Sequence, residues 1–219
     1  MLTFRDIKNN KDINTYIESA DVALKALGFT EHSFAHVTKV ASTVKYILET
    51  INADTHDIEL AQIAAYLHDI GNVINRIEHS QSGAVMAFRI LDNLGLPAED
   101  IATIVTAIGN HDEGTGVPVN PIAAALILAD KSDVRRSRVR NSDPSTFDIH
   151  DRVNYSAVSS IISVSEAKTF IKLELEIDTA ISSVMNYFEI FLSRMLLCRK
   201  AAESLGLAFK LIINGQTLL

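Results

Sequence analysis

Hydrophobic residues recur every three or four positions over most of the first 155 residues, which is the spacing of helices that bury one face. We expect Thr30 to cap the second of these helices, so that His32 and His36 share one of its faces. Gly28, Gly71 and the pair Asn120–Pro121 are typical of helix ends and starts. The predicted helices lie at residues 12–27, 30–48, 55–68, 80–94, 97–109 and 121–134.

Beyond residue 155 the hydrophobic period changes from helical to two, which is the period of half-buried strands. A long amphipathic segment that begins at Asp178 or Thr179 separates the alternating stretches, and Asn214–Gly215 is a turn signal. The pattern predicts a mainly α fold, a helical bundle over 1–155 with a small C-terminal ββαβ unit of α+β type over 156–219. Its strands are expected at residues 156–164, 171–177 and 207–213, with the helix ending at Gly206.

The composition is that of an ordered globular chain, with 47% hydrophobic and 21% charged residues among 219. A formal charge of −7 argues against a stable nucleic-acid complex, because binding to a phosphate backbone needs clustered lysine and arginine. The single cysteine, Cys198, lies among apolar helical residues and is read as a buried thiol. There is no signal-peptide pattern and no apolar run long enough for a membrane helix, so we expect a cytoplasmic protein without a membrane partner.

Candidate chemistry begins with the adjacent pair His68–Asp69, at the end of an apolar helix and just before Gly71. Asp130 has a similar setting, since it follows an all-apolar run over 122–129. An unpaired carboxylate in a core costs several kcal/mol, so both carboxylates require a partner, and a cation is a suitable one.

Further histidines extend this pair into a potential ligand set. Imidazole and carboxylate groups without cysteine suit iron, manganese, zinc, nickel or cobalt. Taken singly, each histidine is more often a core or surface residue, and His56 and His150 keep that interpretation because their surroundings are polar. The candidate metal ligands are His36, His68, Asp69, His79, His111 and Asp130.

The order and neighbours of these residues resemble the HD superfamily of metal-dependent phosphohydrolases. The resemblance rests on His36, on His68-Asp69-Ile70-Gly71 and on Asp130 within Ala-Asp-Lys-Ser-Asp. His79, followed by Ser82-Gly83, and His111, within Gly-Asn-His-Asp-Glu, match the extra histidines of the two-metal members of that superfamily. The all-helical prediction for the first 155 residues agrees with the HD-type fold.

The resemblance implies a site with two divalent transition-metal ions. One ion would be held by His36, His68, Asp69 and Asp130, and Asp69 would bridge to a second held also by His79 and His111. In the family, water or hydroxide between the metals attacks phosphorus, and coordination lowers the pKa of water from ~16 towards ~7. Two divalent cations against two carboxylates leave the pocket positive, which attracts a phosphate despite the acidic chain.

The chain departs from the pattern at Asn72, where many two-metal relatives have lysine, and it lacks the Gly-Tyr-Pro signature of cyclic-dinucleotide phosphodiesterases. Asn72 is expected to donate hydrogen bonds to a phosphate without supplying charge. Lys131 and Arg135, one helical turn apart, are candidates for the missing charge and for substrate binding. Arg136, Arg138 and Arg140 are further candidates for this charge, and for Arg138 and Arg140 a solvated face is an equally good interpretation.

Three further assignments concern catalysis and substrate contact. Asp69 and Lys131 are predicted to act in catalysis, and Asp112 to serve as a general acid or as a partner of a ligand. His32 is expected either to touch substrate or to lie on a helix surface.

Three functions remain open at this point. The first is a phosphohydrolase acting on a small phosphorylated substrate, a nucleotide above all. The second is a mixed-valent di-iron oxygenase, which uses a similar ligand set. The third, motivated by Asn72, is a module that senses a nucleotide without hydrolysing it. We also expect a homodimer formed through the C-terminal unit, because small units with open strand edges rarely stand alone.

Overall fold

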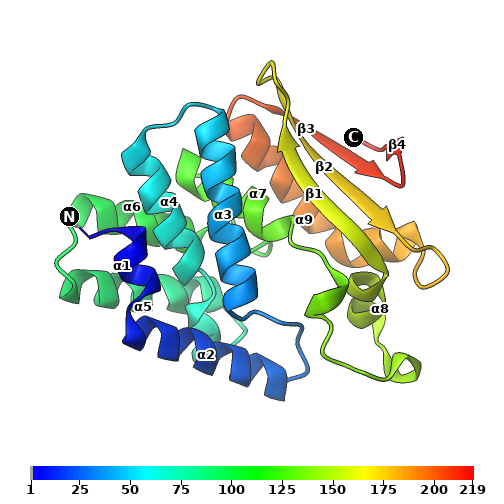
Figure 1. Ribbon diagram of the computed structural model, residues 1–219, viewed down its shortest axis with the longest axis horizontal. Coiled ribbons are helices and arrows are strands. Elements are labelled where there is room, and N and C mark those ends of the chain that lie inside the picture. Colours follow the sequence, from blue (N-terminus) through cyan, green and yellow to red (C-terminus); the bar gives the residue numbers. More distant parts are fainter. Residues whose placement is uncertain (1) are drawn as a thin grey trace.

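The structure, a computed structural model, describes residues 2–219, which form a mainly helical molecule with one sheet along its side (Figure 1). The mainly α prediction is confirmed, and the first part of the chain is helical throughout. Its helices are α1 (Phe4–Lys8), α2 (Lys11–Ala26), α3 (Phe34–Thr50), α4 (Thr55–Leu67), α5 (His79–Asn93), α6 (Ala98–Gly109) and α7 (Pro121–Lys131), with a 3-10 turn η1 (Ile70–Val73) after α4.

Helices α4 and α7 occupy the centre of this bundle because they are apolar on nearly every side. Every residue of α7 from Ile122 to Ala129 is at most 2% exposed. The two helices pack against each other and against α3 and α6. The polar residues at their C-terminal ends therefore enter the interior of the bundle rather than solvent.

The C-terminal part contains a four-stranded sheet in the order β1-β2-β3-β4, and the ββαβ prediction is confirmed. Strands β1 and β2 form an antiparallel hairpin, whereas β2 and β3 are parallel and joined by a helical crossover. Asn214 and Gly215 have φ of 51° and 78° and turn the chain from β3 into β4. The elements are β1 (Ala157–Val164), β2 (Phe170–Ile177), α9 (Val184–Ser204), β3 (Ala208–Ile213) and β4 (Gln216–Thr217).

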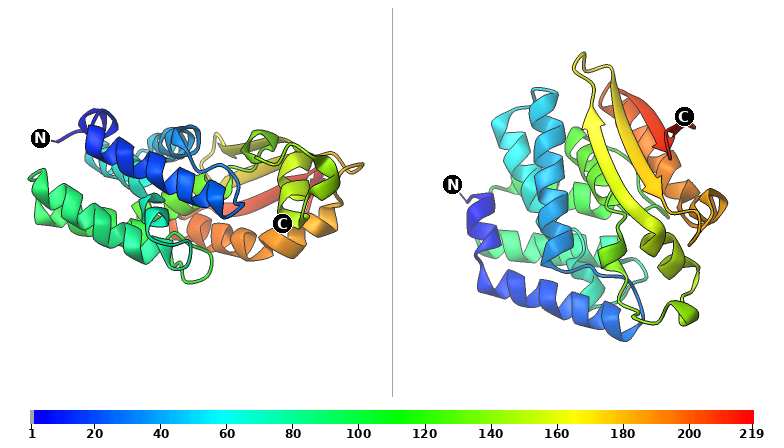
Figure 2. Two further views of the ribbon diagram at one scale, coloured as in Figure 1. Left: turned by 90° about the horizontal axis from the view of Figure 1, so that it is seen from below. Right: turned by 45° about the vertical axis from the view of Figure 1, so that its right-hand side comes forward.

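Helix α9 connects the sheet to the bundle. It covers one face of the sheet through β2 and β3, and it packs against α7 (Figure 2). The division of the chain at residue 155 into two domains stays a prediction. Among residues 2–219, none of the helices combines the length and the apolar character that crossing a membrane requires.

Two predicted helix starts are wrong, and long-range contacts explain the first. Ser33, not Thr30, caps α3, because the backbone N–H of Glu31 donates to the carbonyl of Arg138 and that of His32 to the Asp21 carboxylate. These bonds hold the segment before α3 in a loop.

The second wrong start is that of α9. Asp178 and Thr179 do not begin this helix, whose cap is Ser183, because the Asp178 carboxylate closes a local turn onto Ala180 N–H instead. Helix α7 also ends three residues before the predicted Val134.

Residues 135–151 lie largely at the surface, with only Arg138 and Phe147 buried among them. They form the 3-10 turns η2 (Arg136–Arg138) and η3 (Pro144–Thr146) and then enter α8 (Ile149–Ser156). Arg138 is only 5% exposed, and its guanidinium donates to the carbonyl oxygens of Glu31 and Asp133. The solvated-face interpretation is therefore wrong for Arg138.

Candidate metal centre

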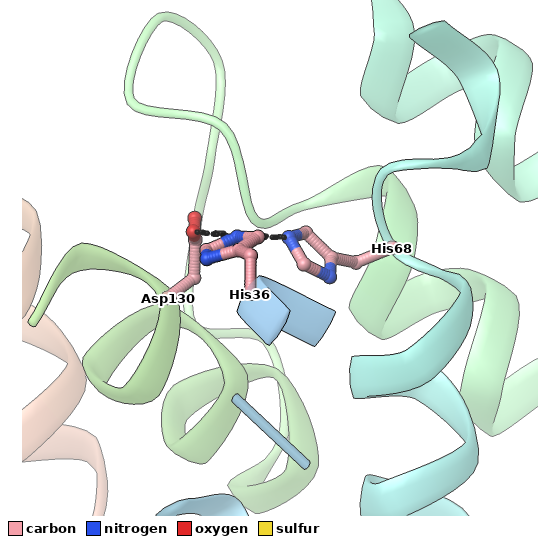
Figure 3. Close-up of side chains that lie close together, drawn as sticks. All are labelled: His36, His68 and Asp130. Atoms are coloured by element: carbon pink, nitrogen blue, oxygen red, sulfur yellow. Dashed lines mark hydrogen bonds and ion pairs between the residues drawn. The ribbon is translucent and has the colours of Figure 1, made fainter. Parts of the chain in front are cut away.

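Three predicted ligands meet where α3, α4 and α7 converge (Figure 3). His36 Nε2 lies 3.3 Å from His68 Nε2 and 3.3 Å from Asp130 Oδ1, and His68 Nε2 lies 3.7 Å from the same oxygen. A cation about 2.1 Å from each atom, the usual distance for zinc, fits inside such a triangle.

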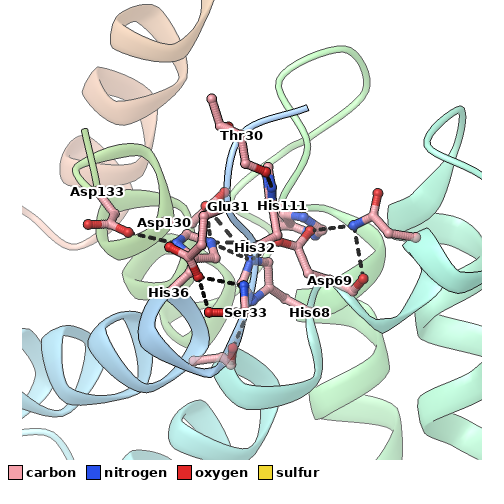
Figure 4. A network of polar contacts seen from close by, with 12 residues as sticks. Thr30, Glu31, His32, Ser33, His36, His68, Asp69, His111, Asp130 and Asp133 are labelled. Carbon is pink, nitrogen blue, oxygen red and sulfur yellow. Dashed lines mark hydrogen bonds and ion pairs between the residues drawn. The ribbon is translucent and has the colours of Figure 1, made fainter. Parts of the chain in front are cut away.

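Asp69 presents its two carboxylate oxygens to two different groups of histidines. Oδ2 lies 3.3 Å from His68 Nε2 and 3.6 Å from His36 Nε2. Oδ1 lies 3.4 Å from His79 Nε2, which in turn is 3.2 Å from His111 Nε2. Figure 4 shows Asp69 in one polar network with His36, His68 and His111. The structure thus brings all six predicted ligands together, with Asp69 shared between two positions.

The tautomers of the four histidines show that these contacts need a cation. Each ring has Nδ1 against an acceptor outside the cluster, so in the neutral ring Nδ1 carries the proton and Nε2 turns an unshared pair inwards. Two such pairs facing at 3.2–3.3 Å repel unless a positive charge lies between them. The acceptors are Asp133 Oδ2 for His36 (2.8 Å) and the carbonyl oxygens of Ala65 for His68 (2.7 Å), Arg76 for His79 (3.1 Å) and Ile108 for His111 (2.6 Å).

The electrostatics of the site favour positive charge at the same place. Burial opposes a charged imidazole at His68, but Asp69 and Asp130 outweigh burial and raise the pKa of His68 to about 10. Burial also opposes ionised carboxylates, yet neighbouring cationic groups, His68 for Asp69 and Lys131 for Asp130, hold the pKa of both well below the usual range. The residues present therefore fit a divalent metal, which supplies the charge that a proton on His68 otherwise provides.

A close contact between two glycines places His79 beside Asp69. A Cβ on Gly71 would lie 2.0 Å from the His79 carbonyl oxygen and 2.4 Å from Gly83 N, and a Cβ on Gly83 would lie 3.2 Å from the His68 carbonyl oxygen. The absence of both side chains lets α5 pack directly on η1. Gly71 is therefore needed for this approach rather than as the helix stop predicted from its position, and α4 is capped at His68.

Asn72 acts on Asp69 instead of facing a substrate. Its Nδ2 donates to the Asp69 carbonyl (2.9 Å) and to Asp69 Oδ1 (3.0 Å), and the residue is 2% exposed. It does not line the neighbouring cavity. Asp112 also lies outside the lining, with Oδ1 4.0 Å from His79 Nε2 at the edge of the cluster.

A cavity of about 440 Å³ opens onto Asp69, His79 and Asp130. Its volume is in the range of small-molecule sites. Residues 148–154 of α8 and its cap make one wall acidic through Asp148 and Asp151. Four cationic side chains also line it: Arg76, Lys131, Arg138 and Arg194.

Some of the predicted substrate-binding residues line the cavity and others do not. Lys131 lines the cavity and pairs with Asp130 Oδ2 and Glu113 Oε2, each at 2.7 Å. His32 also lines it, with Nδ1–H donated to the Thr30 carbonyl (2.7 Å), although it precedes α3 instead of lying on its surface.

Of the other basic residues of the run, Arg138 lines the cavity, whereas Arg135, Arg136 and Arg140 lie outside the lining and pair elsewhere. Arg135 pairs with Glu31 and Asp133, Arg136 donates to the Tyr155 carbonyl, and Arg140 pairs with Asp21. The prediction that Arg135 reaches a substrate is therefore not supported.

Three important residues were missed from the sequence. Arg76 lies 4.0 Å from Asp69 Oδ1 and donates to Asn72 Oδ1 at 3.3 Å. Its position four residues after Asn72 is the signal that points to it. Asp133 orients His36, and it stands in the same Ala-Asp-Lys-Ser-Asp segment that carries Asp130. Arg194, on α9, has no comparable signal.

Comparison with known proteins assigns a domain to the segment that carries the ligands. The model of the HD domain matches residues 33–138, a segment that contains all six candidate ligands. The chain carries an HD domain. HD domains bind divalent metal ions, and the histidine and aspartate clusters of this one are arranged to hold metal.

Two similar proteins can be compared with this chain by sequence identity and coverage. An uncharacterized protein of Methanocaldococcus jannaschii is 24% identical over 213 residues, covering 86% of this chain and 80% of that protein. A crystal structure of a predicted HD superfamily hydrolase from an uncultured Thermotogales bacterium is 23% identical, with a TM-score of 0.46 over 57% of this chain and 68% of that one.

Proposed function

We propose that this HD-domain protein is a metal-dependent phosphohydrolase that cleaves a phosphoester or phosphoanhydride of a small substrate, most simply a nucleotide. The observation that carries the proposal is the orientation of Asp69, whose two oxygens face two separate groups of imidazole nitrogens. A carboxylate shared in this way is the arrangement of two-metal hydrolytic sites.

The ligand atoms support two metal positions. His36, His68, Asp130 and Asp69 Oδ2 would hold one ion, and His79, His111 and Asp69 Oδ1 the other. Divalent cations there would act as Lewis acids on a phosphoryl oxygen and lower the pKa of water.

The side chains around the metal positions would orient the ligands and the substrate. Lys131 holds Asp130 Oδ2, which leaves Oδ1 for the histidines, and Asn72 fixes the plane of the Asp69 carboxylate. Arg76 brings the positive charge that Asn72 lacks, and its guanidinium would contact a phosphate oxygen beside Asp69. Proton donation by Asp112 stays a prediction.

The test is elemental analysis of protein purified without chelators, followed by a metal-dependent screen of nucleotide hydrolysis. The wild type should contain transition metal and release phosphate or nucleotide product, and Asp69→Ala should lose both properties. His56→Ala is the matched control, because His56 pairs with Asp100 away from the cluster and should leave both unchanged. Full activity in Asp69→Ala would falsify the proposal.

The same protein separates the two alternative functions. Tight nucleotide binding without product, after long incubation with several metals, would favour a sensing module. Oxygen consumption by an anaerobically reduced di-iron form would favour an oxygenase.

A further inference from the structure

Helix α9 contributes two side chains to the cavity although it lies outside the segment that matches the HD domain. Phe191 and Arg194 project from this helix, which packs against α7 next to Asp130 and Lys131. The faint orange helix beside α7 in Figure 3 is this part of the chain. One wall of the cavity therefore belongs to the C-terminal α+β part.

Arg194 is held in a fixed orientation that leaves most of its donors unused. Its Nε donates to Glu113 Oε1 at 2.8 Å, and its guanidinium lies over the Phe191 ring, 4.3 Å from the centroid. No other residue within the described range 2–219 accepts a hydrogen bond from its terminal nitrogens. The two NH2 groups form the planar fork that binds carboxylate or phosphate oxygens in pairs.

A chain of ion pairs separates Arg194 from the metal ligands. Glu113 binds Arg194 with one oxygen and Lys131 with the other, and Lys131 in turn binds Asp130 Oδ2 at 2.7 Å. If the charge of Asp130 is balanced by metal, two cations share the single carboxylate of Glu113. This part of the cavity therefore carries an excess positive charge, two side chains away from the metal position.

We propose that Arg194 binds a second anionic group of the substrate, distinct from the phosphoryl group at the metals. The proposal rests on the function proposed above and narrows its substrate to compounds with two anionic groups, such as a nucleoside diphosphate or a bisphosphate. Lys131 and Glu113 fill the space between Arg194 and Asp130, so the guanidinium meets a group beyond the first phosphate. The acidic wall at Asp148 and Asp151 would repel such a group, which leaves the arginine as its binding position.

The experiment compares the binding of a ligand that has one phosphate group with that of a ligand that has two. Inorganic phosphate and imidodiphosphate, a diphosphate analogue that resists hydrolysis, are titrated calorimetrically into the metal-loaded protein. The wild type should bind imidodiphosphate more tightly than phosphate. Arg194→Gln should raise the dissociation constant for imidodiphosphate by at least about tenfold, as expected for the loss of a charge-assisted hydrogen bond. The dissociation constant for phosphate should stay within about twofold of the wild-type value.

Two variants control for indirect effects. Arg199→Gln removes the same charge from an exposed position on the same helix and should bind both anions as the wild type does. Arg194→Lys keeps the charge without the fork and should recover part of the imidodiphosphate affinity. Metal content and melting temperature are measured for every variant, and binding is compared only between proteins that match the wild type in both.

The possible outcomes are distinct. Equal affinity of Arg194→Gln and wild type for imidodiphosphate overturns this inference and leaves the phosphohydrolase proposal standing. An equal loss of affinity for phosphate and imidodiphosphate in Arg194→Gln also overturns it, because Arg194 then contacts the phosphoryl group at the metals. A metal-loaded wild type that binds neither anion overturns both proposals.

Discussion

The substitution Gly71→Ala tests the contact that sets the second metal position. The added Cβ would lie 2.0 Å from the His79 carbonyl oxygen, whereas ordinary contacts begin at 3.4 Å. Both of the nearest atoms, this oxygen and Gly83 N, belong to the backbone and cannot rotate away. The start of α5 must therefore move by more than about 1 Å relative to η1, since cores relieve such overlap only by displacement.

The displacement has a cost in stability and a cost in metal binding. Overpacking a core typically costs 1–3 kcal/mol, and we expect about 3 kcal/mol here because the clash is with backbone. For a chain of this size that corresponds to a fall in melting temperature of roughly 6–12 °C. His79 Nε2 leaves the ligand position at the same time, since metal–ligand distances tolerate only about 0.2 Å.

The assay is thermal denaturation together with elemental analysis, and neither needs a known substrate. Gly109→Ala is the control, because its Cβ would meet only side-chain atoms at 3.7–3.9 Å at the end of α6. It should be neutral, or more stable by about 0.5–1 kcal/mol, as alanine replaces a helical glycine. If Gly71→Ala melts within about 2 °C of the wild type with the same metal content, the close-approach argument is wrong.

Three other predictions concern the ligands and the thiol. Asn72→Ala removes two hydrogen bonds to Asp69, so metal affinity, measured in competition with a chromogenic chelator, should fall by about 10–100-fold. Asn75→Ala, at an exposed position nearby, should keep the wild-type affinity. Equal losses in both variants would contradict the orienting role of Asn72. The pKa of His68 is raised to about 10 by nearby carboxylates against the effect of burial, so metal must displace its proton at neutral pH. Affinity should then rise as pH increases towards 10, by up to about tenfold per unit, and calorimetry in two buffers should detect proton release; no release would contradict the assignment. Burial raises the pKa of the 1%-exposed Cys198 to about 12, so a thiol reagent at pH 8 should react only after unfolding, and prompt reaction of the native protein would refute this.

The ligand types and the helices that carry them were readable from the sequence. Local periodicity determines which segments become helices, and a helix that is apolar on every side has to be central. Because α4 and α7 both satisfy that condition, His68, Asp69 and Asp130 at their ends had to lie in the interior and needed a charge between them. The alternation in β2 and the Asn214–Gly215 turn were equally local, and both were predicted correctly.

The orientations of the side chains were decided by tertiary contacts. The loop before α3 depends on Glu31 meeting Arg138, 107 residues later, so no local rule for helix caps could predict it. The inward turn of Asn72 depends on Asp69 being free to accept its hydrogen bonds.

The position of Arg194 at the cavity could likewise not be predicted from the sequence, because it depends on α9 packing against α7. Such contacts join residues whose separation along the chain carries no periodic signal. The sequence by itself therefore determined what the site is made of. Only the packing of distant segments decided which atoms face the metal positions and which face the cavity.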